Sequence, residues 1–379
     1  MLTKPERTEP VEAAASTGLR AERTADAAFQ DEMLQGVSRT FALTIPELPE
    51  GLREAVGNGY LLCRILDTIE DEPALNAFEK RALLERFSRV VGGKEPAAPF
   101  GAALAPELST HTIAAEHVLI QQVDRVIAIT HGLAPAQQTA LQRCVRVMAS
   151  GMAGFQEAAE RGQEGVATLE AMNRYCYFVA GVVGEMLTDL FCAFDPEAQG
   201  NAETLRKLAP SFGQGLQMTN ILKDVWEDRE RSACWLPRDV FGLGPDASFD
   251  TLRSEHPERL HAGLRVLLGH AHGHLRNALQ YTLAIPASQP GIRRFCLRAL
   301  GMALLTLRRI HAHPDFTSGG QVKISRRTVK VCIGFTNVAA RHNWLLSAAF
   351  WLFGRGVPLT QPGALDTRPF DPAELSAGQ

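Results

Sequence analysis

Two acidic stretches, YLLCRILDTIED at Tyr60–Asp71 and QMTNILKDVWED at Gln217–Asp228, decide the fold of this chain. In both, apolar side chains recur with the 3.6-residue spacing of an amphipathic helix. The polar face of the first helix carries four side chains within about 60° of one another, namely Tyr60, Arg64, Asp67 and Asp71. The chain is therefore expected to present acids in register along helices.

The second stretch repeats this arrangement about 150 residues later. Its polar stripe follows the spacing i, i+3, i+7 and i+11, with one further acid at its edge: Gln217, Asn220, Asp224, Asp228 and Glu227. Each stripe could be a solvated helix face. Alternatively, like charges one turn apart repel unless a cation lies between them, and oxygen ligands of this kind suit Mg²⁺. If the two helices face each other, they form a metal cluster that could hold a diphosphate.

Helical periodicity continues outward from these stretches through most of the 379 residues. Helices are predicted over 50–72, 77–91, 109–130, 134–162, 167–192, 201–228, 249–283, 288–312 and 325–354, with short Pro- and Gly-rich breaks between them. No alternating pattern predicts a strand. We expect one all-α domain over residues 28–356, with flexible tails over 1–27 and 357–379.

Composition excludes several classes of protein. Lys and Arg number 39 against 42 acidic residues, so there is no basic excess for binding nucleic acid. Seven cysteines without a C-x-x-C pair indicate free thiols and a cytoplasmic location. The apolar segment Trp344–Gly354 is too short to span a membrane. It predicts either a core helix or peripheral contact with a membrane surface. We expect a monomer.

Five blocks together carry a family resemblance. They are VSRTF at Val37–Phe41, the stretch at Tyr60–Asp71, YCYFVAGVVG at Tyr175–Gly184, the stretch at Gln217–Asp228, and a C-terminal pair at Phe295–Leu307 and Val322–Arg326. In these blocks the chain resembles the squalene/phytoene synthase family over residues 37–326. The C-terminal pair favours the squalene-forming branch.

The resemblance implies an isoprenoid-synthase-type helical bundle with a central cavity. It implies that two molecules of farnesyl diphosphate are joined head to head to presqualene diphosphate with Mg²⁺, and that NADPH then drives reduction to squalene. A same-fold synthase that makes presqualene diphosphate, dehydrosqualene or phytoene without NADPH is the first alternative. A non-catalytic helical scaffold is the second.

The resemblance also implies roles for particular residues. The metal ligands would be Asp67, Glu70, Asp71, Asp224, Glu227 and Asp228. The diphosphate would contact Ser38, Arg39, Arg64, Gln217 and Lys223. Catalytic side chains would be Tyr175, Arg64, Tyr60 and Asn220. The phosphates of NADPH would contact Lys323 and Arg326.

Some positions depart from the family pattern. Lys223 stands where Arg is usual, and Ala233 stands where Arg precedes the aromatic-Pro step. Ala299 and Leu300 replace a Pro-Gln pair, which weakens the expectation of the reductive step more than that of the condensation. The glycines of the Tyr175–Gly184 block predict either tight helix packing or room for a prenyl chain.

Overall fold

The computed structural model describes residues 25–38, 40–159, 164–230, 233–244 and 247–370. Within these residues it is built of helices, without a strand; a single bridge pairs Val166 with Pro237. The predicted all-α fold is therefore confirmed for the described part of the chain.

The first half of the chain has three long helices, with short helices before the first of them and between the second and the third. In order these are a helix over residues 25–37, α2 (Phe41–Thr44), η1 (Ile45–Glu47), α3 (Glu50–Asp71), α4 (Ala77–Val91), α5 (Ala97–Leu104), η2 (Ala105–Glu107), α6 (Ala114–Gln121), α7 (Val123–Gly132) and α8 (Pro135–Ala159).

The second half contains the longest helix, α12, and the C-terminal helices. In order these are α9 (Leu169–Cys176), the π-helical turn η3 (Tyr177–Gly181), α10 (Val182–Phe194), α11 (Pro196–Gly200), α12 (Ala202–Glu230), α13 (Phe249–Glu255), α14 (Pro257–Ala284), α15 (Pro290–Ala312), α16 (Gly319–Val322), α17 (Arg326–Ala339), α18 (Asn343–Gly354) and η4 (Pro362–Ala364).

Most predicted helices are present, but three of them are divided. The predicted range 249–283 breaks at Pro257, which lacks a backbone N–H and so begins α14 instead of continuing α13. The ranges 109–130 and 325–354 likewise become two helices each. Conversely, α5 forms inside a segment that was predicted to be a break, because its Ala and Leu content favours a helix despite the nearby prolines.

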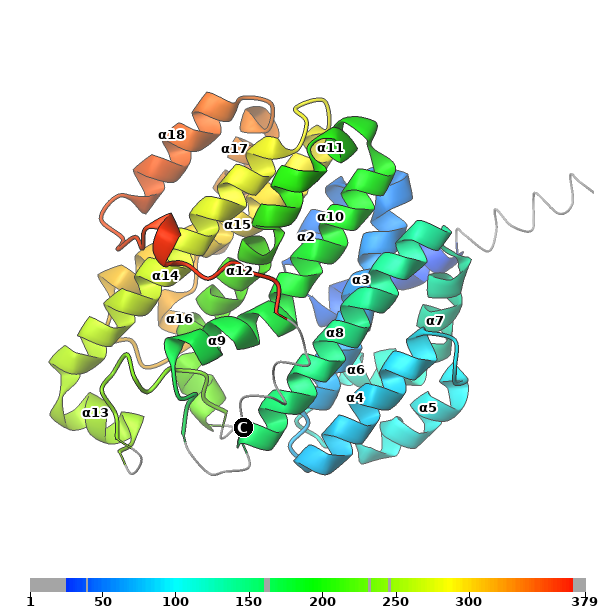
Figure 1. The fold of residues 1–379 in the computed structure, drawn as a ribbon, viewed down its shortest axis with the longest axis horizontal. Coiled ribbons are helices and arrows are strands. Elements are labelled where there is room, and N and C mark those ends of the chain that lie inside the picture. The colour runs from blue at the N-terminus through cyan, green and yellow to red at the C-terminus, as the bar shows by residue number, and fades with distance from the viewer. Residues whose placement is uncertain (1–24, 39, 160–163, 231–232, 245–246, 371–379) are drawn as a thin grey trace, which may run out of the picture.

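Helix α12 lies at the centre of the fold, between α14 and α10 (Figure 1). A Cβ atom on Gly213 would lie 1.9 Å from the carbonyl oxygen of Ala180, and one on Gly184 would lie 2.1 Å from that of Ala209. No side chain larger than hydrogen fits at either position. Both glycines therefore allow close helix packing, which for Gly184 is the first of the two predicted explanations.

The C-terminal segment corrects one prediction. Residues 357–370 do not form a free tail, since Val357, Leu365 and Phe370 are buried. The backbone oxygen of Asp366 accepts a hydrogen bond of 2.8 Å from Asn173 Nδ2. The prolines of this segment limit its helical structure to the single turn η4, but its few apolar side chains still pack on the core. The predicted N-terminal tail lies outside the described residues up to 24, and residues 25–27 already belong to a helix.

Candidate active site

The acidic end of α3 begins with a tyrosine–arginine pair. Arg64 Nη2 donates a hydrogen bond of 2.9 Å to Tyr60 Oη, and the Tyr60 hydroxyl donates one of 3.3 Å to the backbone oxygen of Val37. Arg64 Nη1 lies 3.6 Å from Glu116 Oε1 on α6. Arg64 Nε is buried without a hydrogen-bond partner among the described residues. The guanidinium is therefore fixed in position and still has a donor to offer.

Burial and neighbouring acids shift the charges on this helix. Burial, with help from Asp71 and Glu116, raises the pKa of Asp67 to about 7, although Arg64 opposes the shift. Burial also raises the pKa of Glu116. Acids whose ionised form is costly in the absence of a cation are typical of a functional site. Glu116 had no recognisable sequence signal, because it approaches α3 only in the folded chain.

Tyr175 on α9 contacts the acidic end of α3 and an aromatic ring beyond the end of α12. Its hydroxyl donates a hydrogen bond of 3.3 Å to Glu70 Oε2 near the end of α3. Its ring stacks on Trp235, just beyond α12, with 3.6 Å between ring centroids and 10° between planes. The ring of Phe155 on α8 meets Tyr175 edge-on at 5.3 Å. Burial and the acids of α3 raise the pKa of Tyr175, so the phenol keeps its proton.

The polar stripe of α12 is half-buried except at Asn220. Asn220 is exposed, and Gln217 is half-buried. Lys223 Nζ lies 2.8 Å from Asp224 Oδ2, so this cation neutralises one of the acids. Glu227 Oε1 accepts a hydrogen bond of 2.7 Å from the backbone nitrogen of Gly319 at the start of α16.

The acids of α3 and α12 suit a metal site that substrate oxygens complete better than a site formed by protein ligands alone. No group of three or more His, Cys, Asp or Glu residues in the described chain is placed to hold an ion. However, Glu227 Oε2 is buried without a hydrogen-bond partner among the described residues, as suits an oxygen awaiting a cation. Mg²⁺ commonly takes one or two carboxylates and completes its shell with water and phosphate oxygens. The role of the six acids as ligands remains a prediction.

Other predicted residues lie in the surroundings of the site. Ser38 is buried, and its Oγ accepts a hydrogen bond of 2.9 Å from Phe41 N, so its oxygen takes part in starting α2. Arg39 lies outside the described residues. Lys323 and Arg326 are exposed and follow α16, which contacts Glu227 through Gly319.

The positions that depart from the family pattern can also be located. Ala299 and Leu300 are buried in α15. Arg229, a candidate substitute for the missing arginine at 233, already forms ion pairs with Glu164 and with Asp250, the latter at 2.8 Å. It is therefore not available as a simple replacement.

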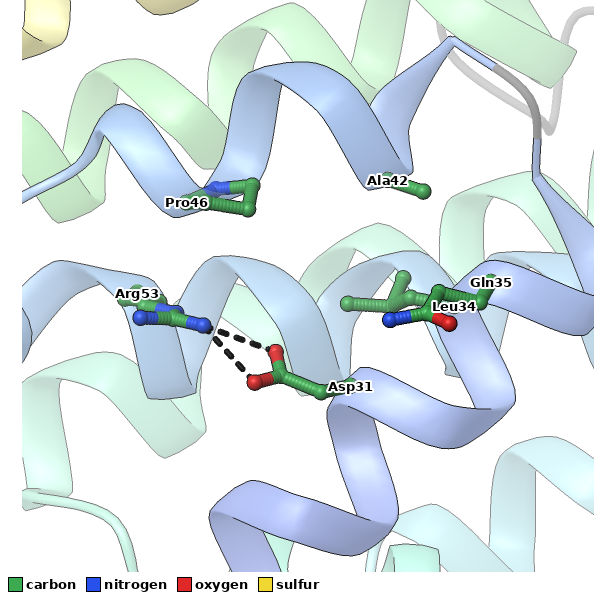
Figure 2. Close-up of a pocket in the computed structure, with 6 residues that line it drawn as sticks. All are labelled: Asp31, Leu34, Gln35, Ala42, Pro46 and Arg53. Carbon is green, nitrogen blue, oxygen red and sulfur yellow. Dashed lines mark hydrogen bonds and ion pairs between the residues drawn. The ribbon is translucent and has the colours of Figure 1, made fainter.

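Two small surface hollows of the described residues lie away from the acids. Figure 2 shows one of about 120 Å³ beside α3, where Arg53 Nη2 contacts both carboxylate oxygens of Asp31 at 2.8 and 2.9 Å. The other, of about 200 Å³, lies between α5 and α7. The central cavity expected for a prenyl substrate accordingly remains a prediction.

Known proteins resemble the chain over most of its length. The profile of the family described as squalene/phytoene synthase matches residues 34–328. A squalene synthase of Candida albicans is 32% identical over 300 residues, which cover 78% of this chain and 64% of that protein. The match thus spans a little under two thirds of that relative's length.

Solved structures share the fold. The complex of TcSQS with the ligand E5700 has a TM-score of 0.71 at 24% identity and covers 93% of this chain and 96% of that one. A dehydrosqualene synthase in complex with a ligand has a TM-score of 0.59 at 18% identity, with coverage of 84% and 97%. At these identities the likeness establishes the fold alone.

Proposed function

Because the chain belongs to the squalene/phytoene synthase family, we propose that it joins two molecules of farnesyl diphosphate to presqualene diphosphate and reduces this intermediate to squalene. Relatives named squalene synthase are about 30% identical over most of the chain, which supports this substrate and product. The proposal includes Mg²⁺ and NADPH as cofactors.

The observation that carries the proposal is the position of Tyr175. Its hydroxyl contacts an acid of α3, and its ring stacks on Trp235 in the segment beyond the end of α12. Acids that could hold a leaving diphosphate through a cation therefore lie next to electron-rich rings. Such rings stabilise a carbocation of the kind that remains when an allylic diphosphate departs.

The side chains would divide the work as follows. Arg64, oriented by Tyr60, would donate a hydrogen bond to a diphosphate oxygen through its Nε, which has no partner among the described residues. Tyr175 would present a protonated phenol to the cationic intermediate, because Glu70 accepts its hydrogen bond. Mg²⁺, when bound by Asp67, Asp71, Asp224 and Asp228 with Glu70 and Glu227 in support, neutralises the leaving group.

The reductive step would use the basic residues after α16. NADPH, when bound, supplies the hydride. Lys323 and Arg326 would contact its phosphates, since both are exposed and α16 holds them near the acidic end of α12. The lack of acidic residues anywhere between Asp315 and Asp366 also favours an anionic ligand in this region.

Product analysis tests the proposal directly. Purified protein is incubated with farnesyl diphosphate and Mg²⁺, with and without NADPH, and the products are identified by mass spectrometry. We expect squalene only when NADPH is present. Presqualene diphosphate or dehydrosqualene in both reactions would retain the condensation and reject the reductase role. No consumption of substrate would refute both.

Variants separate the metal site from the rest of helix α12. Asp67→Asn and Asp224→Asn are each expected to lower turnover by at least about 100-fold, because a carboxylate that neutralises the leaving group is lost. Glu203→Gln, an exposed acid in the first turn of α12, is the matched control and should leave turnover unchanged. Normal turnover in both aspartate variants would show that the metal assignment is wrong. The hypothesis of a non-catalytic scaffold would follow only if the wild type were also inactive.

A further inference from the structure

The outer face of α18 is apolar although it faces water. Its outward residues Trp344, Ala348, Trp351 and Leu352, which we call the α18 face, are all exposed, and the two tryptophans are 72% and 66% accessible. The helix contains no charged residue between Asn343 and Gly354. A helix that is apolar on both sides is ordinarily buried in protein or in contact with lipid.

This exposure is concentrated in one region. Of the thirteen large apolar residues exposed in the described chain, seven lie between 331 and 359, and the other six are scattered over five helices and one loop. Figure 1 shows α18 at the rim of the molecule, outside α14 and α15. Contiguous exposed apolar surface of this kind marks an interaction site.

The inner side of α18 is firmly attached to the fold, so the outer face is a feature of the folded state. Leu346 is buried, and the ring of Phe350 packs 5.5 Å from that of His272 on α14. At the start of the helix, Asn343 Oδ1 accepts a hydrogen bond of 2.8 Å from the buried Arg293. The helix is therefore a rigid platform.

The distribution of charged residues indicates what kind of surface covers the α18 face. Residues 316–365 contain six Lys and Arg residues and no acid, whereas the other 33 cations and all 42 acids lie elsewhere, which leaves the rest of the chain with a net charge of −9. Lys323 and Arg326 are assigned to the cofactor above. Two of the remaining cations flank α18 directly: Arg341 precedes it and Arg355 follows it, with the Arg355 guanidinium carbon 5.7 Å from the centroid of the Trp351 ring. Tryptophan beside arginine suits the boundary between lipid headgroups and acyl chains.

We propose that the α18 face docks the protein onto an anionic lipid bilayer. The twelve residues of α18 measure about 18 Å, against a hydrocarbon core of about 30 Å, so the helix lies on the bilayer and does not cross it. Among the described residues, the helical run Leu169–Phe194 is long and apolar enough to cross a membrane, but 67% of its apolar window is buried inside the fold. A second copy of this chain is a poor occupant, because a symmetric contact would oppose the same cations.

Vesicle flotation tests this docking without any substrate, so its outcome is independent of the catalytic proposal. Wild-type protein is mixed with vesicles of phosphatidylcholine alone or of phosphatidylcholine with phosphatidylglycerol. We expect it to float with the mixed vesicles at low salt and to be released at high salt. Absence of flotation, or equal binding to neutral vesicles, would overturn the proposal.

Two matched pairs of variants locate the surface. Trp344→Ser with Trp351→Ser should weaken binding at least about tenfold, whereas Phe78→Ser, at an equally exposed site on α4, should not. The double variant Arg341→Gln with Arg355→Gln should weaken binding to the mixed vesicles about fivefold for each cation removed. The control double variant, Lys207→Gln with Arg265→Gln at exposed sites on α12 and α14, should leave this binding unchanged.

Circular dichroism and thermal unfolding of each variant show that the fold persists, since all the altered side chains are exposed. Unchanged binding by the tryptophan variant would overturn the proposal. The proposal would also be overturned if ultracentrifugation showed that the wild type is a dimer and that the tryptophan variant is a monomer.

Discussion

His274 makes the stability of this protein depend on pH in a calculable way. The side chain lies in α14, buried against the central helix α12, and its Nδ1 is 3.1 Å from Ser211 Oγ. The Ser211 oxygen already accepts a hydrogen bond from Asn277 Nδ2, so its own hydrogen can be donated to His274. Burial, with a contribution from His270, lowers the pKa of His274 from 6.5 to about 3.

The sign of the effect follows from this shift. Below pH 6.5 the unfolded chain binds a proton at His274, whereas the folded chain does not until the pH approaches about 3. The free energy of unfolding therefore falls as the pH is lowered, by up to about 1.4 kcal/mol per pH unit. Between pH 7 and pH 5 the loss amounts to about 2 kcal/mol, and any folded-state pKa at or below about 4 gives nearly the same value.

Urea unfolding followed by circular dichroism measures this loss. The free energy of unfolding is determined at pH 7, 6 and 5 for the wild type, for His274→Asn, and for His111→Asn as an exposed control. Other titrating groups contribute equally to all three proteins and cancel in the comparison. We expect the wild type and the control to lose about 2 kcal/mol more than His274→Asn on going from pH 7 to pH 5. If His274→Asn keeps the full pH dependence, the reasoning is refuted.

Three further predictions concern packing and hydrogen bonding. Gly213→Ala places a methyl group 1.9 Å from a backbone carbonyl oxygen and should lower the free energy of unfolding in urea by about 3 kcal/mol. The control Gly132→Ala, where nothing lies within 4 Å of the new methyl group, should lower it little. Equal stability of the two variants would contradict this expectation. Tyr175→Phe removes the hydrogen bond to the buried Glu70 and should lower the melting temperature by only about 2–4 °C, while turnover falls at least about tenfold; an unchanged rate would reject a catalytic phenol. Arg293→Met leaves the backbone oxygens at the end of α14 without their donor and should cost about 3–5 kcal/mol in the same unfolding assay, an expectation that a loss below about 1 kcal/mol would exclude.

Local features of the sequence account for the bounds of α3 and α4. Asn76 and Glu79 form a capping box, which is why α4 begins where its sequence indicates. The run before Pro73 ends α3 within one residue of the predicted end. These features depend on residues within a few positions of one another, so the sequence displays them directly.

Contacts between distant segments could not be predicted in this way. Glu116 and Trp235 belong to the candidate site only because α6 packs beside α3 and because the chain beyond α12 returns to α9. The buried positions of Val357, Leu365 and Phe370 have the same origin, since a proline-rich segment carries no periodicity that predicts packing.

The sequence by itself determined the all-α fold and the two acidic helix faces of this protein, because helical periodicity and side-chain register are local properties of the chain. Only the tertiary structure decided that Tyr175 lies between Glu70 of α3 and Trp235, that Gly184 and Gly213 allow helices to touch, and that α18 turns an apolar face outward. Those features depend on which helix surfaces are covered by others, and that follows from the packing of segments separated by more than a hundred residues in the sequence.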